Sequence, residues 1–92
     1  MKTYRVEVRL DWGKRAHMDG ATVAQQAEAV AAARQVMPEL HVWRGGSCRM
    51  TLLGSRSISD DAELAPLVPA IRSAIKALRH APLVAVDAWL IG

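Results

Sequence analysis

Residues 3–12 alternate strictly between apolar and polar side chains, and this alternation constrains the fold more than any other feature of the sequence. The apolar set is Tyr4, Val6, Val8, Leu10 and Trp12, and the polar set is Arg5, Glu7, Arg9 and Asp11. A period of two over this length predicts a strand that buries one face and exposes the other to water. Sheets with one wet face are typically antiparallel, so we expect this strand to join an antiparallel sheet.

Two segments have the composition of helices. Residues 22–37 are rich in alanine, the best helix former, and are followed by Pro38, which excludes the preceding residue from the helical region. The buried face of this helix is predicted to comprise Val23, Ala27, Val30 and Met37. Residues 66–79 predict an amphipathic second helix. Its apolar side comprises Leu67, Val68, Ile71, Ile75 and Leu78, and its basic side Arg72, Lys76 and Arg79.

Three further strands complete the prediction. Residues 39–44 and 47–53 predict two strands, and Gly45-Gly46 between them indicates a type I′ hairpin turn, which requires positive φ at both positions. Residues 54–59 are expected to form a loop. Asp60 and Glu63 have the spacing of a capping box ahead of the second helix. Residues 83–91 predict a final apolar strand.

The order strand, helix, strand, strand, helix, strand defines the expected fold. It predicts an α+β, ferredoxin-like β-α-β-β-α-β sandwich, with a four-stranded antiparallel sheet and two helices on one face. The first and third strands would be central. The length of 92 residues and the absence of repeats or linkers predict one domain over residues 1–92.

If both helices cover one face of the sheet, each strand has an inner and an outer set of side chains. Keeping Asp87 out of the core directs Val84, Val86, Ala88 and Leu90 inward in the last strand. In the middle strands, the inner set is Leu40, Val42, Met50 and Leu52. The helix-free face is then predicted to carry the candidate binding residues, which are Arg5, Arg9, His41, Trp43, Arg49, Leu53, Trp89 and Ile91.

Cys48 is the only cysteine, which excludes an internal disulfide and a zinc site built from cysteines of one chain. No stretch approaches the about 20 apolar residues of a membrane span, and the N-terminal segment lacks an apolar signal core. These features predict a cytoplasmic protein without a membrane partner. The net charge of +3, with a pI near 9.6, is only mildly basic.

The segment that precedes the first helix is a candidate anion-binding loop. It contains Lys14, Arg15 and His17, and a helix N-terminus with basic neighbours can hold an anion. His17 and Asp19 are both metal-ligand types, but a metal needs three or four ligands and no further spacing indicates them. Motifs of nucleotide-binding loops, zinc proteases and serine hydrolases are absent. We therefore predict no catalytic residue, no metal and no cofactor.

Three function classes are compatible with this sequence. The first is a small non-enzymatic binding or assembly module that associates through the helix-free face, either with itself or with another protein. Exposed Trp and Arg favour it, because these residues dominate binding hot spots, and monomers rarely expose contiguous apolar area. The second is a cofactor-independent enzyme of the dimeric α/β-barrel type, for which His17, His41 and Asp87 are the available polar groups. The third is a weak nucleic-acid binder, and no specific nucleic-acid partner is expected, because the arginines of the face are interrupted by Glu7 and Asp87.

Overall fold

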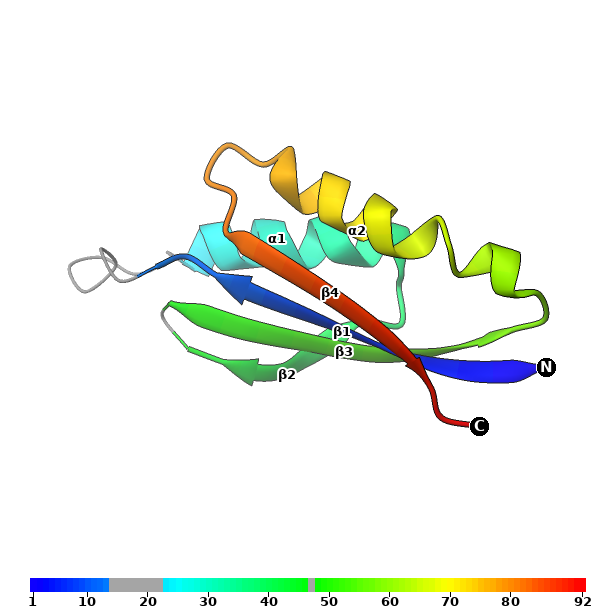
Figure 1. Ribbon diagram of the computed structural model, residues 1–92. Coiled ribbons are helices and arrows are strands. Elements are labelled where there is room, and N and C mark those ends of the chain that lie inside the picture. The colour runs from blue at the N-terminus through cyan, green and yellow to red at the C-terminus, as the bar shows by residue number, and fades with distance from the viewer. Residues whose placement is uncertain (14–22, 47) are drawn as a thin grey trace.

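Strands β1 (Lys2–Asp11) and β3 (Arg49–Ile58) form the centre of a four-stranded antiparallel sheet, flanked by β2 (His41–Gly45) and β4 (Leu83–Leu90). The computed structural model describes residues 1–13, 23–46 and 48–92. Helices α1 (Val23–Val36) and α2 (Leu67–Lys76) lie on the same side of the sheet (Figure 1). The order β2-β3-β1-β4, with β1 and β3 central, confirms the predicted ferredoxin-like fold.

The core lies between the helices and the inner face of the sheet. Val8 of β1 is fully buried and lies between Leu52 of β3 and Val86 of β4. The predicted inward residues of β1 and β3 are confirmed at Val6, Val8, Leu10, Met50 and Leu52. The helices add Ala29, Ala33, Leu67, Ile71 and Ile75 to the same core.

The buried face of α1 matches the prediction only in part: Met37 is buried and Val30 is partly buried against the core, but the other two predicted residues are not. Val23 is 85% exposed and Ala27 is exposed, whereas Ala29, Ala33 and Met37 are fully buried. The buried residues recur every four positions, so their side chains lie one above the other. Two of these positions are alanine, and α1 lies in contact with α2. The prediction was wrong at Val23 and Ala27 because nearly every position of this helix is alanine or polar, and the valines were the strongest apolar signal.

Strand β3 extends through most of the segment that was predicted to be a loop. It pairs with β1 over its whole length, from Arg49 opposite Asp11 to Ile58 opposite Lys2. Gly54 lies on the inner face, where a Cβ would be 2.8 Å from the Glu39 carbonyl oxygen. Arg56 donates two hydrogen bonds of 2.7 Å to the Glu39 carboxylate. The α1–β2 connection therefore packs directly against β3 and is hydrogen-bonded to it.

The hairpin between β2 and β3 is wider than predicted. Its last residue pair is Gly45 with Met50, so residues 46–49 form the connection, and residue 47 lies outside the described part. Neither Gly45 nor Gly46 has a positive φ, and the predicted type I′ turn is wrong. A bulge between Val42 and Arg44 shifts the register of β2 by one residue.

The segment before α2 forms a short 3₁₀ helix, η2 (Asp61–Glu63). The Asp60 carboxylate accepts a hydrogen bond from the Ala62 N–H at 3.0 Å, which confirms Asp60 as a cap. Glu63 accepts from the Ser59 hydroxyl instead of completing a capping box. The regular part of α2 starts after Pro66 and ends at Lys76, three residues before the predicted end at Arg79.

Candidate binding face

The face of the sheet opposite the helices, called here the helix-free face, is assembled by the strand register. Arg5 lies between Ser55 of β3 and Trp89 of β4, and Glu7 lies between Leu53 and Asp87. Among the predicted site residues, the register brings together Arg5, Arg9, His41, Arg49, Leu53 and Trp89. Ile91 follows β4 and donates its N–H to the Thr3 carbonyl at 2.9 Å.

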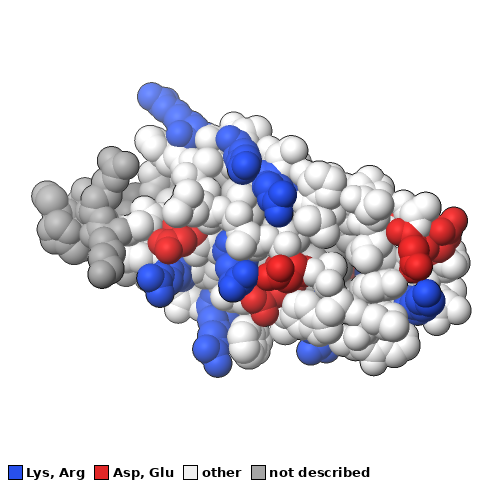
Figure 2. All heavy atoms as spheres, viewed as in Figure 1, with Lys and Arg blue, Asp and Glu red and all other residues white. Residues whose placement is uncertain are grey.

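The carboxylates of the helix-free face are each held by an arginine of the same face. The Arg9 guanidinium contacts Asp87 at 2.7 Å and Glu7 at 3.4 Å. Arg49 contacts Asp11 at 3.5 Å. Acidic and basic side chains are accordingly interleaved over the sheet in Figure 2. The negative charge of this face is therefore offset from within the chain.

Two arginines beside these pairs have no ion-pair partner among the described residues. The Nε atom of Arg5 is buried and has no hydrogen-bond partner within the described part of the chain. Arg44 follows the bulge of β2, lies opposite Thr51, and places its guanidinium carbon 4.4 Å from the centre of the Trp43 ring. Four arginines and three carboxylates leave the face with one net positive charge.

The exposed apolar side chains of the sheet fall at its two edges. Trp89 and Ile91, 41% and 46% exposed, lie at the β4 edge, and Trp43, 51% exposed, lies in the bulge of β2. Because β3 and β1 separate these edges, Trp43 and Trp89 do not form one contiguous apolar patch. The apolar area predicted for this face is present but divided, with the partly buried Leu53 between its two parts.

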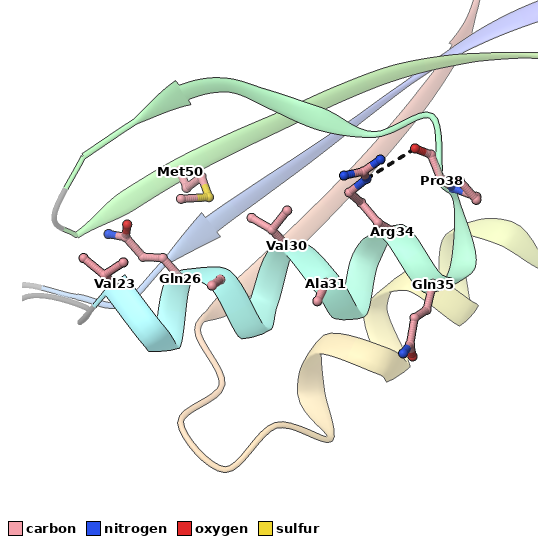
Figure 3. A pocket seen from close by; sticks show the side chains of 9 residues that line it. Val23, Gln26, Val30, Ala31, Arg34, Gln35, Pro38 and Met50 are labelled. Carbon is pink, nitrogen blue, oxygen red and sulfur yellow. Dashed lines mark hydrogen bonds between the residues drawn. The ribbon is translucent and has the colours of Figure 1, made fainter.

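Open hollows in the described part of the chain adjoin the sheet, and two of them are the larger ones. One, of 430 Å³, lies over the ends of β1, β3 and β4 and is bordered by the Arg49–Asp11 ion pair and by Leu83, which is 76% exposed. The other, of 570 Å³, lies on the helix side between α1 and Met50 (Figure 3). Val23, Gln26 and Val30 line its α1 wall, which explains why the exposed Val23 does not join the core. Gln26 spans its end by donating to the Gly46 carbonyl at 2.8 Å.

The remaining predicted groups do not form a chemical site in the described part. Lys14, Arg15 and His17 of the candidate anion loop, and Asp19, lie outside the described residues. His41 is exposed on β2. Within residues 1–13, 23–46 and 48–92, no three His, Cys, Asp or Glu side chains are grouped to hold a metal, and no helix has the length and apolarity to cross a membrane.

The comparisons with known proteins support the fold. No protein-family model matches the chain, and no curated protein matches it. A solved structure, described as a REP-associated tyrosine transposase bound to a REP hairpin, superimposes with a TM-score of 0.54 at 15% sequence identity. The match covers 99% of this chain and 56% of that chain. At this identity the likeness shows a shared fold.

Two residues of the face were missed by the sequence analysis. Arg44 was treated as the end of a strand, because the bulge that turns it onto the face leaves no mark in an alternating pattern. Leu83 was counted as an ordinary strand residue, although the register places it opposite Asp11 on the helix-free side. Its exposure follows from its position at the start of an edge strand, which becomes evident only when the strand order is known.

Proposed function

We propose that this chain is a small non-enzymatic binding module whose helix-free face docks against the surface of a protein partner. The observation that carries the proposal is the pairing of Glu7, Asp11 and Asp87 with arginines of the same face. Among the arginines of this face, it leaves Arg5 and Arg44 without an ion partner in the described chain, beside exposed Trp89 and Trp43. Arg and Trp with this exposure are typical anchors of protein interfaces.

This charge distribution defines the kind of partner surface that fits. A partner would place apolar side chains on Trp89 and Leu53, and carboxylates or carbonyl groups near Arg5 and Arg44. Burial of an arginine without an acceptor is costly, so acceptors on the partner are required. A protein surface that is both acidic and apolar therefore complements the unpaired arginines and the apolar side chains of the face.

The enzyme alternative has less support. A barrel formed by two sheets needs a polar reactive group enclosed between them. Of its described candidates, Asp87 is exposed and bonded to Arg9, and His41 is exposed on an edge strand. His17 lies outside the described residues.

Binding of nucleic acid is the second alternative, and a surface other than the helix-free face supports it. Arg72, Lys76 and Arg79 follow one another at helical spacing along and just beyond α2, and none has an ion pair within the described residues. The similar solved structure is bound to a REP hairpin. Three cations in one row support weak, salt-sensitive contact with phosphates, and this ridge lies on the helix side, away from the tryptophans of the sheet.

Site-specific photo-cross-linking tests the proposal. A photoreactive phenylalanine analogue is placed at Leu53, in the middle of the helix-free face, and as a control at Lys76 on α2. We expect one discrete adduct with a partner protein from the Leu53 position and none of that mass from Lys76. The adduct should disappear when Arg5→Ala and Trp89→Ala are introduced together.

Adducts that form equally from Lys76, or that persist in the Arg5→Ala/Trp89→Ala chain, would contradict the proposal. Thermal unfolding of that double variant shows whether the fold is retained. The partner identified in the adduct can then be purified and titrated against the chain.

A further inference from the structure

The two edges of the sheet differ in their ability to accept another strand. Strand β2 is short, carries a bulge, and ends in Gly45-Gly46, and these features oppose pairing at that edge. Strand β4 pairs with β1 from Leu83 to Leu90 without any register shift. Its eight residues contain no proline and no lysine, and Asp87 is its one charged residue. Figure 1 shows β4 at the open edge of the sheet, where no described strand lies beside it. Such an edge is a template for pairing.

The free backbone groups of β4 can be assigned from the ladder. The Ile91 N–H donates to the Thr3 carbonyl, so the odd-numbered residues of β4 direct their backbone groups toward β1. Since hydrogen-bonded and non-hydrogen-bonded pairs alternate in an antiparallel ladder, the even-numbered residues direct theirs outward. The outward residues are Val84, Val86, Ala88 and Leu90.

We propose that β4 pairs antiparallel with β4 of a second copy across a two-fold axis at Val86. In an antiparallel pair, a residue whose backbone groups point toward the other strand lies opposite another such residue. Two opposed residues of β4 are therefore both even-numbered or both odd-numbered, and the two-fold axis passes through a residue. Two axes pair seven of the eight strand residues with one another, one at Val86 over residues 83–89 and one at Asp87 over residues 84–90. The axis at Asp87 would set two like charges directly opposite each other, which is unfavourable.

The axis at Val86 gives a self-complementary set of neighbours. On the helix-free side, Trp89 lies opposite Leu83 of the partner subunit, and Asp87 lies opposite Ala85 of the partner subunit. The two most exposed apolar side chains of that side of β4 thus cover each other. The two Asp87 residues become diagonal neighbours, with Cα atoms about 7–8 Å apart. Each Asp87 carboxylate keeps its own Arg9. The second copy extends the sheet to twice its number of strands.

This inference concerns the edge of the sheet and shares Trp89 with the proposed docking face. An edge-paired dimer leaves Arg5, Leu53 and His41 accessible on both copies. Failure of face docking and failure of edge pairing therefore have separate readouts, namely the adduct from Leu53 and the mass of the chain alone in solution.

Charge substitution at Ala85 tests the register. In the dimer, Ala85→Asp sets a carboxylate opposite Asp87 of the partner subunit at two symmetric places, whereas Ala85→Lys creates two cross-strand ion pairs. Within one copy, however, Ala85 lies opposite Arg9, so the single chain favours Asp over Lys. Edge pairing therefore predicts tighter association for Ala85→Lys than for Ala85→Asp, whereas the stability of the single chain predicts the opposite order. Thr51 lies opposite Arg9 on the other side, far from the edge, and Thr51→Asp with Thr51→Lys is the matched control.

Sedimentation equilibrium over a range of concentrations gives the dimer dissociation constant of each chain. We expect a wild-type dimer, at least tenfold weaker association for Ala85→Asp, equal or tighter association for Ala85→Lys, and less than twofold change for either Thr51 variant. High salt should reduce the difference between the two Ala85 variants. A monomeric wild-type chain, or dimer stabilities that follow the single-chain order, would overturn the proposal.

A backbone variant tests edge pairing without introducing a charge, so that loss of the dimer can be distinguished from misfolding of the charge variants. Ala88→Pro removes an outward N–H and leaves the ladder with β1 intact, so the chain should stay folded and become monomeric. A folded Ala88→Pro chain that dimerises as tightly as the wild type would also overturn the proposal. Circular dichroism establishes folding in each case.

Discussion

Glu7 and Asp87 lie directly opposite each other on β1 and β4, and Arg9 contacts both carboxylates. Two carboxylates in this position would repel each other without the guanidinium. The arginine lies two residue pairs along the ladder, on the same face, opposite the small side chain of Ala85. The pairing between β1 and β4 and the electrostatics of the helix-free face thus depend on the same residue.

Substitution Arg9→Met should therefore lower the free energy of unfolding, by about 1 kcal/mol at most because the group is largely exposed. The loss has a specific cause, so Asp87→Asn in the Arg9→Met background should restore part of it. Urea unfolding at low salt measures both effects. Arg79→Met, which removes an exposed arginine without an acidic partner in the described chain, is the control and should change little.

Gly54 is predicted to be intolerant of any side chain. Gly54→Ala would bring a Cβ within 2.8 Å of the Glu39 carbonyl oxygen and 3.0 Å of the Leu40 nitrogen. Both neighbours are backbone atoms that cannot rotate away, and overpacking of this kind costs about 1–3 kcal/mol. Gly45→Ala, whose Cβ would meet only the Val42 side chain at 3.8 Å, is the matched control. Equal unfolding midpoints for the two variants would contradict the close approach of β3 to the α1–β2 connection.

The Glu39–Arg56 pair predicts a pH dependence of stability. The hydrogen bond from Arg56 holds the pKa of Glu39 below its ordinary value of 4.5, despite partial burial, which acts in the opposite direction. A depressed carboxyl pKa adds stability above the unfolded-state pKa, and this stability is lost as the pH falls through the folded-state value. Wild-type stability should therefore fall below about pH 4.5, more steeply than that of Glu39→Gln.

The magnitude of this effect should stay below about 1 kcal/mol, since the two side chains are 38% and 31% exposed and water screens them. Unfolding free energies of wild type and Glu39→Gln between pH 3 and pH 7 measure the difference. Parallel curves would contradict the role given to this pair. Arg56→Gln should behave like Glu39→Gln, because either change removes the same bidentate contact.

Nucleic acid is expected to bind only weakly. Arg9 and Arg49 of the helix-free face are paired with carboxylates, and within the described residues Arg72, Lys76 and Arg79 form a basic row on the helix side. Titration of fluorescent single- and double-stranded oligonucleotides at about 150 mM salt should give dissociation constants weaker than about 1 μM, as for nonspecific contact. Sub-micromolar affinity that is lost in Arg49→Ala or Trp43→Ala would contradict this account and favour the nucleic-acid class.

The parts of the fold that sequence predicted best are those with strong chemical contrast. Strand β1 alternates valine and leucine with charged residues, and its buried and exposed faces were assigned correctly. Helix α1 carries no such contrast, and the burial of Ala29 and Ala33 arises from tertiary packing that periodicity does not describe. Strand β3 was cut short because Gly54, Ser55 and Ser57 are weak strand formers. Long pairing with β1 outweighs their propensity.

The membership of the helix-free face followed from one argument, the exclusion of Asp87 from the core. The same argument could not show that Trp43 and Trp89 occupy opposite edges as a divided apolar surface, because bulges and edge exposure arise from tertiary pairing. The ion pairs of Arg9 and Arg49 were likewise invisible, since they join residues of three different strands. These contacts change the face from a generally basic surface into one with a few unpaired arginines.

The central claim, that the helix-free face binds a protein partner, is tested most directly by calorimetric titration of the cross-linked partner with Arg5→Ala and Lys76→Ala chains. Arg5 lies on a central strand, away from the β4 edge, so its substitution reports on the face alone. We predict at least tenfold weaker binding for Arg5→Ala and less than twofold change for Lys76→Ala. Unchanged binding by a folded Arg5→Ala chain, together with weakened binding by Lys76→Ala, would contradict the claim and place the partner on α2.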